Sequence, residues 1–463
     1  MYDPAAISHL LRRSQPRRLG IPKRVEWFLF FKITNVDDFK KYLKELIPAI
    51  TTSTDIAEIR NAINDHKNEG KQGLIRVSGI NLAFSNRGIQ TLGIDDDLTD
   101  PSFTSGQLAR AQALGDQGQI IGDTFDVNWI PAFKGGDIDG LAGDCEASVV
   151  EAFNRVTNVL GNSFKEVLKV KGGVRPGKEK GHEHFGFLNG ISQPAILSVT
   201  PPPFPGQAVV DPGIIIVGAT GDPNLSSRPS WAVNGSFLVY RQLNQLVPEF
   251  SKFLVDNPIH EVGLPPAEGS ELLGARFVGR WKSGAPVALA PTHDDPELAA
   301  DKQRNNNFDF SEAADQTNCP FAAHIRKTNP RSDLSRFGPS ATLLHSISRQ
   351  SIPFGPEVTP EEYRENKTHC DRGLSFVCYQ SVLANGFEFM QARANNIHFP
   401  VKQVVPGFDP IIGQNGNDTR TTQGSDPTAQ SNSLSLPFEF VVSKGGEYFF
   451  SPSITALKTK FAA

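Results

Sequence analysis

The sequence predicts an α+β protein in which antiparallel strands pack against helices on one side. Two observations support this prediction. A buried strand followed by an amphipathic helix occurs near the start of the chain and again after its midpoint. A second strand pattern likewise occurs once in each half of the chain. Between the copies lies a proline-rich segment, Thr200–Gly206, which indicates a linker. We therefore expect two strand-helix-strand halves, residues 1–200 and 201–463.

The first strand-helix pair lies near the start of the chain. Glu26–Lys32 is an apolar run typical of a buried strand, and Asp37–Ile47 then places Phe39, Tyr42 and Leu43 on one helical face. Because that face is apolar and the rest of the segment is charged, we expect the helix to cover a sheet.

The second pair repeats this pattern. Ser236–Arg241 is the corresponding strand, and the following helix carries three apolar residues at the same spacing, namely Phe250, Phe253 and Leu254. The other echo relates Val77–Phe84 to Leu374–Tyr379, each followed by a helix-like segment. The polar segment Asn415–Ser433 is typical of a surface loop.

Composition narrows the class of protein. The 463 residues are 38% hydrophobic and 21% charged, as in ordinary globular proteins, and the net charge of −4 gives no reason to expect nucleic-acid binding. No run of about 20 apolar residues predicts a membrane span, and the first residues lack the apolar stretch of a signal peptide. Four cysteines without a Cys-x-x-Cys pair predict neither a disulfide framework nor a zinc site.

The stretch from Cys319 to Gly355 carries the most informative chemistry. His324 lies among apolar residues, a basic run then closes in Asn-Pro-Arg, and Arg349 precedes an Ile-Pro pair. This pattern suits haem, since its iron prefers an imidazole ligand and its propionates prefer cations. The same pattern fits a core histidine bonded to the backbone, so these residues alone leave both interpretations open.

Five segments in order, taken together, resemble the dye-decolorizing peroxidase family, and its fungal secreted members most. They are Gly181–Pro194, which contains Gly186-Phe187-Leu188-Asn189-Gly190, then Cys319–Arg331, Ser348–Pro353, Gly373–Gln380 and Phe408–Gly413. The resemblance implies two ferredoxin-like domains, 1–200 and 201–463, whose four-stranded antiparallel sheets face each other with peripheral helices. The distal motif falls in the first domain, and the histidine and distal arginine fall in the second.

The resemblance also implies a cofactor, haem b, and residues that hold it. His324 is the implied iron ligand, and Asp409 is the implied acceptor for its other ring nitrogen. Arg331 and Arg326 are implied partners of the propionates. The residues implied to line a narrow distal cavity are Leu374 and Phe376.

On the distal side the chain departs from the family pattern. The resemblance implies that Arg349 stabilises departing charge, but Asn189 stands where the family has a catalytic aspartate. A carboxamide cannot take up and return a proton at ordinary pH, so we expect impaired peroxide activation. Two origins are open: an inactivating change, which the intact surrounding motif favours, or a natural variant in which Arg349 and water move the proton.

The function implied is a haem peroxidase that uses hydrogen peroxide to oxidise dyes, phenolics and other aromatic substrates through a ferryl intermediate. The alternative is a haem-binding carrier or sensor without effective turnover. We expect a secreted monomer or weak homodimer that binds neither nucleic acid nor membrane. A further pattern, His182-Glu183-His184, could suggest a metal cluster, but a surface turn is the preferred interpretation.

Overall fold

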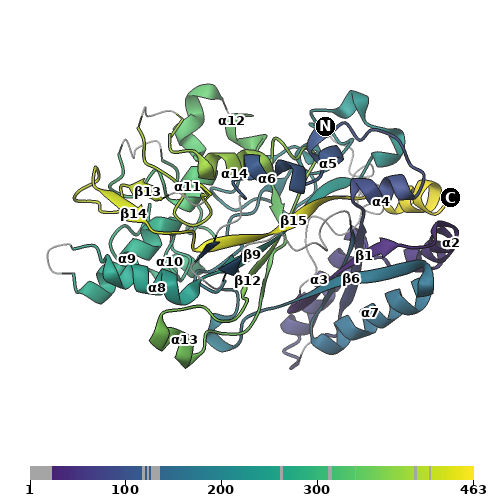
Figure 1. Cartoon of the computed structure of the whole chain (residues 1–463), viewed down its shortest axis with the longest axis horizontal. Coiled ribbons are helices and arrows are strands. Elements are labelled where there is room, and N and C mark those ends of the chain that lie inside the picture. The colour runs from purple at the N-terminus through teal and green to yellow at the C-terminus, as the bar shows by residue number, and fades with distance from the viewer. Residues whose placement is uncertain are drawn as a thin grey trace.

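The computed structural model describes residues 23–73, 75–116, 120–121, 125–126, 136–260, 264–310, 315–338, 340–400, 404–416 and 419–463. Within these ranges a large antiparallel sheet runs in the order β15-β9-β12-β11-β6-β1-β5-β2, with β10 beside β12 (Figure 1). Its first half consists of β1 (Val25–Ile33), β2 (Ser78–Ala83), β5 (Asp137–Gly143) and β6 (Phe164–Gly173). Its second half consists of β9 (Ser236–Gln245), β10 (Ser348–Arg349), β11 (Ile352–Phe354), β12 (Gly373–Gln380) and β15 (Val441–Ser451).

The two halves of the sheet have the same strand order. In β6-β1-β5-β2 and in β15-β9-β12-β11, the last strand of the unit lies beside its first. This is the arrangement of a ferredoxin-like β-α-β-β-α-β unit. The halves meet at both edges, because Phe354 of β11 lies opposite Gly172 of β6 and Phe84, just after β2, bridges to Phe450 of β15. The predicted pair of ferredoxin-like units is confirmed.

The inner faces of the two half-sheets share a core. Phe28 and Phe30 of β1 contact Tyr240 of β9, with ring centroids 5.0 and 4.9 Å apart, and Phe30 also contacts Phe449 of β15 at 6.3 Å. Because side chains alternate along a strand, the residues between them point the other way. The two sheets therefore face each other across an aromatic layer.

Helices cover the outer face of the first half. Leu29 and Phe31, which alternate with the inner phenylalanines, belong to one buried cluster with Phe39 and Leu43 of α2 (Val36–Leu46). The Asn35 side chain caps this helix by accepting from a backbone N–H. Figure 1 shows α7 (Glu146–Leu160) alongside β6, with α3 (Ser53–Asn68) on the same side of the molecule. The predicted first strand-helix pair is confirmed.

The helices of the second half lie at the opposite end of the molecule (Figure 1). The helix predicted after β9 is α8 (Val247–Asp256), and its buried residues include Phe250, Phe253 and Leu254. Other helices of this half are α9 (Pro266–Val278), α10 (Pro296–Ala300), α11 (His324–Thr328), α12 (Ser340–Leu343), α13 (Pro360–Glu365) and α14 (Phe387–Asn395). The second strand-helix pair is therefore also confirmed.

Shorter elements complete the described chain. Between β2 and β5 lie α4 (Asn86–Thr91), α5 (Pro101–Ser105), α6 (Ala111–Leu114), β3 (Ile120–Ile121) and β4 (Phe125–Asp126). Thr200–Gly206 is a loop held at both ends, because β7 (Ala195–Ile196) and β8 (Val209–Val210) pair in parallel. The predicted surface loop Asn415–Ser433 contains an ordered excursion, since β13 (Arg420–Gln423) pairs with β14 (Ser433–Leu436).

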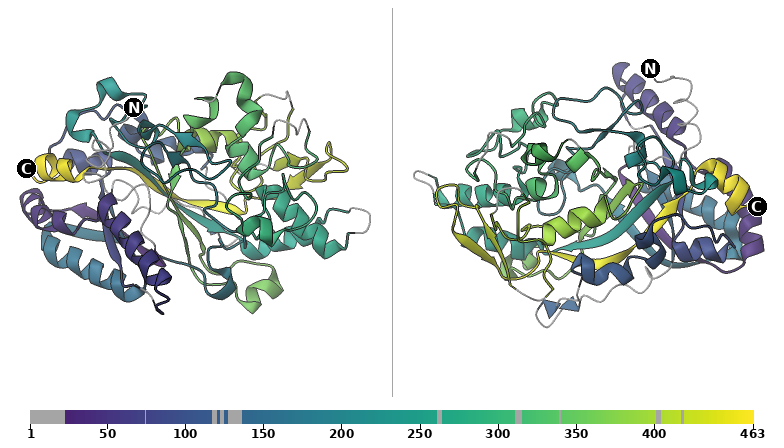
Figure 2. Two further views of the ribbon diagram at one scale, coloured as in Figure 1. Left: turned by 180° about the vertical axis from the view of Figure 1, so that it is seen from behind. Right: turned by 90° about the horizontal axis from the view of Figure 1, so that it is seen from above.

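The C-terminal end returns to the first half. After α15 (Ile454–Ala456), Phe461 packs against Phe84, with ring centroids 4.8 Å apart, and both views in Figure 2 show this end beside the N-terminal elements. In the described ranges no helix combines the length and apolar character needed to cross a membrane.

Candidate active site

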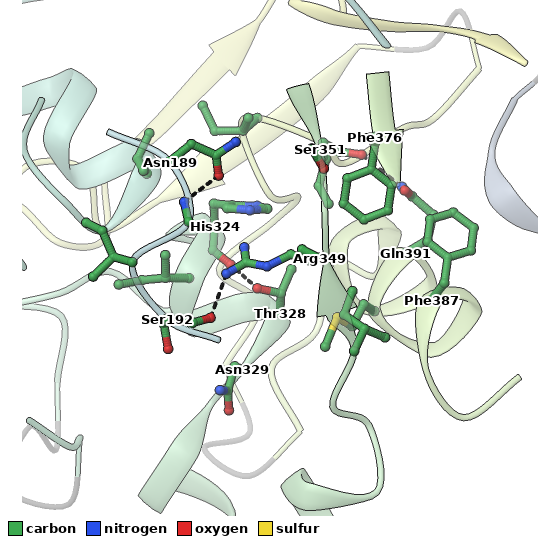
Figure 3. A pocket seen from close by; sticks show the side chains of 18 of the residues that line it. Asn189, Ser192, His324, Thr328, Asn329, Arg349, Ser351, Phe376, Phe387 and Gln391 are labelled. Atoms are coloured by element: carbon green, nitrogen blue, oxygen red, sulfur yellow. Dashed lines mark hydrogen bonds between the residues drawn. The ribbon is translucent and has the colours of Figure 1, made fainter. Parts of the chain in front are cut away.

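A cavity of about 300 Å³ lies in the second half and reaches the distal loop of the first. Figure 3 shows that Asn189, His324 and Arg349 surround the same space although they come from three separate segments. The other predicted residues that line this cavity are Arg331, Leu374 and Phe376. The fold thus brings together side chains from Asn189 to Phe376, which are 187 positions apart in the sequence.

His324 is the first residue of α11, and its ring is fixed by a carboxylate. Nδ1 lies 2.8 Å from an oxygen of Asp409, which is fully buried, and the other oxygen of Asp409 accepts from the backbone N–H groups of Ile411 and Ile412 at 2.8 and 3.0 Å. A neutral imidazole bound in this way carries its proton on Nδ1 and leaves the lone pair on Nε2. The pair therefore presents a histidine ready to bind a metal.

Arg331 borders the cavity with its guanidinium anchored by neutral groups. It donates to the backbone oxygens of Asn306 and Phe308 at 3.0 and 2.6 Å and to the side-chain oxygen of Asn306. Burial lowers the pKa of Arg331 to about 10, so the group is still a cation at neutral pH. The histidine and this cation match the iron and propionates of haem, and the residues therefore fit that cofactor.

Arg280 is a second cation that sequence reasoning missed. It lines the cavity and donates to the same Asn306 side-chain oxygen at 3.1 Å and to two backbone oxygens. Burial, with the charges of Arg331 and Arg349, lowers the pKa of Arg280 to about 9. It precedes His324 by 44 positions and belongs to no motif, so no signal in the sequence marks it.

Arg326 lies away from the cavity. Its fully buried guanidinium makes a two-point ion pair with Asp333, at 2.8 and 3.0 Å, and also donates to the backbone oxygen of Cys319. Residues two apart on a helix do not share a face, so a helix that turns His324 toward the cavity turns Arg326 into the core. The structure does not bring Arg326 to the other predicted residues.

The distal residues are held by the backbone. The Asn189 side-chain oxygen accepts from the N–H of Gly190 at 2.7 Å, which leaves its amide nitrogen, a donor, as the free polar end. Arg349 donates to the carbonyl of Ser192 at 2.6 Å, and its backbone exchanges two hydrogen bonds with the Gln193 side chain. Burial lowers the pKa of Arg349. The loop and the arginine are thus fixed relative to each other.

Apolar residues form the remaining predicted wall. Leu374 and Phe376 are two apart on β12 and point to the same side, and Phe376 packs against Phe387 of α14 with ring centroids 6.0 Å apart (Figure 3). His345 and Arg393 also line the cavity and were not predicted. The His345 ring stacks on that of Phe389 with ring centroids 3.3 Å apart, and burial lowers the pKa of Arg393. The proximity of His345 to Arg349 in the sequence is the one signal that could have found it.

His182-Glu183-His184 forms the predicted turn, but the turn is not fully at the surface, since its residues are half-buried or buried. His184 is buried and its Nε2 lies 2.9 Å from the backbone oxygen of Phe354. Glu183 accepts from the N–H groups of Phe185 and Phe187, so the segment is a tight internal turn. Among the described residues no group of His, Cys, Asp and Glu could hold a metal ion of its own.

Comparison with known proteins supports the fold and identifies the family. The family model for the "DyP dimeric alpha+beta barrel domain" matches residues 18–176, and that for "Dyp-type peroxidase, C-terminal" matches residues 219–398. The chain is 45% identical to a dye-decolorizing peroxidase of Mycena epipterygia, over 96% of this chain and 85% of the relative. It is also 45% identical to dye-decolorizing peroxidase AauDyP1 of Auricularia auricula-judae, over the same shares of each chain.

Solved structures agree. A mutant dye-decolorizing peroxidase from Pleurotus ostreatus is 48% identical, over 98% of this chain and 99% of that one, with a TM-score of 0.93. An ancestral D-type dye-decolorizing peroxidase is 51% identical, with the same coverage and a TM-score of 0.92. The fold and site therefore define a peroxidase, an oxidoreductase that acts on peroxide. The chain belongs to the DyP-type peroxidase family, whose members are haem enzymes.

Proposed function

We propose that the cavity binds haem b, with His324 as the iron ligand and Arg331 beside the propionates. The observation that supports this most strongly is the hydrogen bond from His324 to the buried Asp409 carboxylate at the wall of a cavity bordered by cations. When bound, haem would supply the redox-active iron at which peroxide is reduced. Leu374 and Phe376 would line the distal space, whereas Arg326 keeps a structural role in this proposal.

Arg349 is the proposed distal catalytic residue. Its guanidinium is fixed by Ser192 and borders the same cavity as His324, so it can stabilise the negative charge that develops on the departing peroxide oxygen. Asn189 offers an N–H donor on that side but no group that can accept and return a proton. We therefore propose that peroxide activation is slowed, since general acid-base catalysis contributes about 10²- to 10⁴-fold.

The test is stopped-flow absorption of the haem-loaded protein mixed with hydrogen peroxide. We expect Asn189→Asp to accelerate the first change of the Soret band by about 10²- to 10⁴-fold, because an aspartate restores the proton acceptor. Asn189→Ala is the matched control and should bring no acceleration. Equally rapid changes in the original and aspartate proteins would show that Arg349 and water suffice, and the proposed impairment would be wrong.

The reducing substrates that we propose are dyes, phenolics and other aromatic compounds. A related dye-decolorizing peroxidase, 44% identical with a TM-score of 0.87, is described in complex with 2,6-dimethoxyphenol. We also propose that the chain is secreted and works as a monomer or weak homodimer. Residues 1–200 and 201–463 are the proposed domains.

A haem carrier or sensor remains the second candidate, favoured only by Asn189. A carrier has no need of a fixed arginine on the distal side or of a buried carboxylate behind its ligand, and this chain has both. The same stopped-flow experiment separates the candidates. A carrier would fail to respond to peroxide in the Asn189→Asp form as well.

A further inference from the structure

Asp409, the carboxylate behind His324, lies close to a second buried charge. Lys327 is in the same short helix as His324, three positions further on, and its side chain is almost fully buried. Its Nζ donates to the backbone oxygens of Gly407 and His398, at 2.8 and 3.4 Å. The first of these is only two positions from Asp409, so the ammonium is anchored to the turn that carries this carboxylate.

The charges of Lys327 and Asp409 interact. Burial lowers the pKa of Lys327 to about 8, Asp409 opposes this shift, and Arg393 adds to it, so the group is still a cation at neutral pH. Arg420, also buried, donates to the backbone oxygens of Gly413 and Asp409 at 2.6 and 3.4 Å. Burial lowers its pKa, and the negative charges of Glu439 and Asp409 oppose this shift. The turn that carries Asp409 therefore holds two buried cations, and the charge of Lys327 interacts with the carboxylate.

A carboxylate that accepts the Nδ1 proton makes an iron-bound imidazole more electron-donating, and more so as the carboxylate becomes more basic. A buried cation beside that carboxylate has the opposite effect, because it stabilises the negative charge and reduces its basicity. We infer that Lys327 is a positioning residue for electron donation: its ammonium weakens the hold of Asp409 on the His324 proton and so limits electron donation from the imidazole to iron.

This inference rests on the proposed role of His324 as iron ligand, and both can be tested on the ferrous holoprotein. Lys327→Gln removes the charge, while its amide can still donate to Gly407 and His398. We expect the iron-histidine stretching frequency in resonance Raman spectra to rise and the Fe(III)/Fe(II) potential to fall, because the imidazole becomes a stronger donor. Lys327→Arg, which keeps the charge, is the matched control and should leave both near their original values.

A double-mutant comparison separates this route from a direct effect on iron. In an Asp409→Asn background, Lys327→Gln should no longer move the stretching frequency. An unchanged frequency in the single variant, or an equal shift in both backgrounds, would overturn the inference. Lys327→Met provides a second neutral side chain if the glutamine variant fails to fold. If the original protein shows no iron-histidine band at all, the proposed ligand is wrong, which is a different result from a band that does not shift.

Discussion

Asn306 holds two guanidiniums beside each other at the wall of the cavity. Its side-chain oxygen accepts from both Arg331 and Arg280, and its amide donates to the backbone of Gly206 at 2.9 Å. The buried Arg280 and the half-buried Arg331 share one neutral acceptor and repel each other: after burial, the charge of Arg331 contributes to the lowered pKa of Arg280. An anionic ligand between or beside them would relieve that repulsion, which is the role that we propose for the haem propionates.

The first prediction concerns Arg331. Arg331→Gln should release haem about 10- to 100-fold faster, since a hydrogen bond to a charged group contributes about 1.5–3 kcal/mol. The rate can be measured by transfer of haem to an excess of apomyoglobin. Haem dimethyl ester, which lacks propionate charges, is the matched ligand and should show little difference between the two proteins. A similar acceleration for both ligands would mean that Arg331 supports the fold and not the propionates.

The sequence predicted the site residues that belong to motifs and missed those that do not. His324 and Arg349 were expected to share a cavity and both line one, and Asp409 was expected beside His324 and lies 2.8 Å from its Nδ1; their chemical roles stay predictions. The sequence could not show whether Arg326 or Arg331 faces the cavity, because this depends on how the five-residue helix α11 is oriented in the fold. Arg280 could not be expected, because the groups that accept its hydrogen bonds, such as those of Asn305 and Asn306, lie about 25 positions away in the sequence.

The two half-sheets meet where β6 pairs with β11. A Cβ atom on Gly172 would lie 2.5 Å from a methyl of Ile352 and 3.1 Å from the backbone oxygen of Pro353. The side chain of Ile352 is branched at Cβ and has little rotational freedom, so it cannot easily move aside. The close approach of the two halves at this edge therefore depends on a glycine.

The second prediction follows from this contact. Gly172→Ala should lower the free energy of unfolding by about 1–3 kcal/mol, the usual cost of overpacking. Gly173→Ala is the matched control, because its added methyl would meet only the Arg24 backbone oxygen at 3.9 Å. Urea unfolding followed by tryptophan fluorescence can compare the two variants. If both are equally stable, the two half-sheets can separate at this edge without cost.

Regular elements were predictable because their apolar residues follow simple patterns. β1 is a continuous apolar run that is buried on both faces, α2 buries one face at helical spacing, and both elements were expected within one residue of their ends. The pairing of β13 with β14 was not expected, since their sequences are polar and short and only a partner strand reveals them. The burial of the turn at Glu183 was also not expected. Its carboxylate accepts from nearby backbone N–H groups, and the sequence pattern does not show such contacts.

The second edge between the two halves closes beside a buried acid. Asp137 begins β5 and accepts from the N–H and hydroxyl of Ser85 at 2.9 and 3.1 Å, next to the bridge from Phe84 to Phe450. Burial raises the pKa of Asp137 to about 7, and the negative charge of Glu447 of β15 adds to the rise. The hydrogen bonds from Ser85 lower the pKa but do not cancel this effect. The carboxyl of Asp137 is therefore protonated in the folded protein over a range where it is ionised in the unfolded chain.

The last prediction is that the molecule is more stable in mildly acidic solution because of Asp137. Its pKa is 3.8 in the unfolded reference and about 7 when folded, so between these values the folded state binds the extra proton. Stability from this group is full below pH about 4 and falls as pH rises toward about 7, by up to about 4 kcal/mol. Asp137→Asn cannot ionise and should not show this loss. Urea unfolding of both proteins from pH 4 to 7.5 should give curves that diverge with rising pH. Parallel curves would mean that the carboxyl ionises in the folded protein as it does in water, and that the closure between Phe84 and Phe450 does not depend on its protonation.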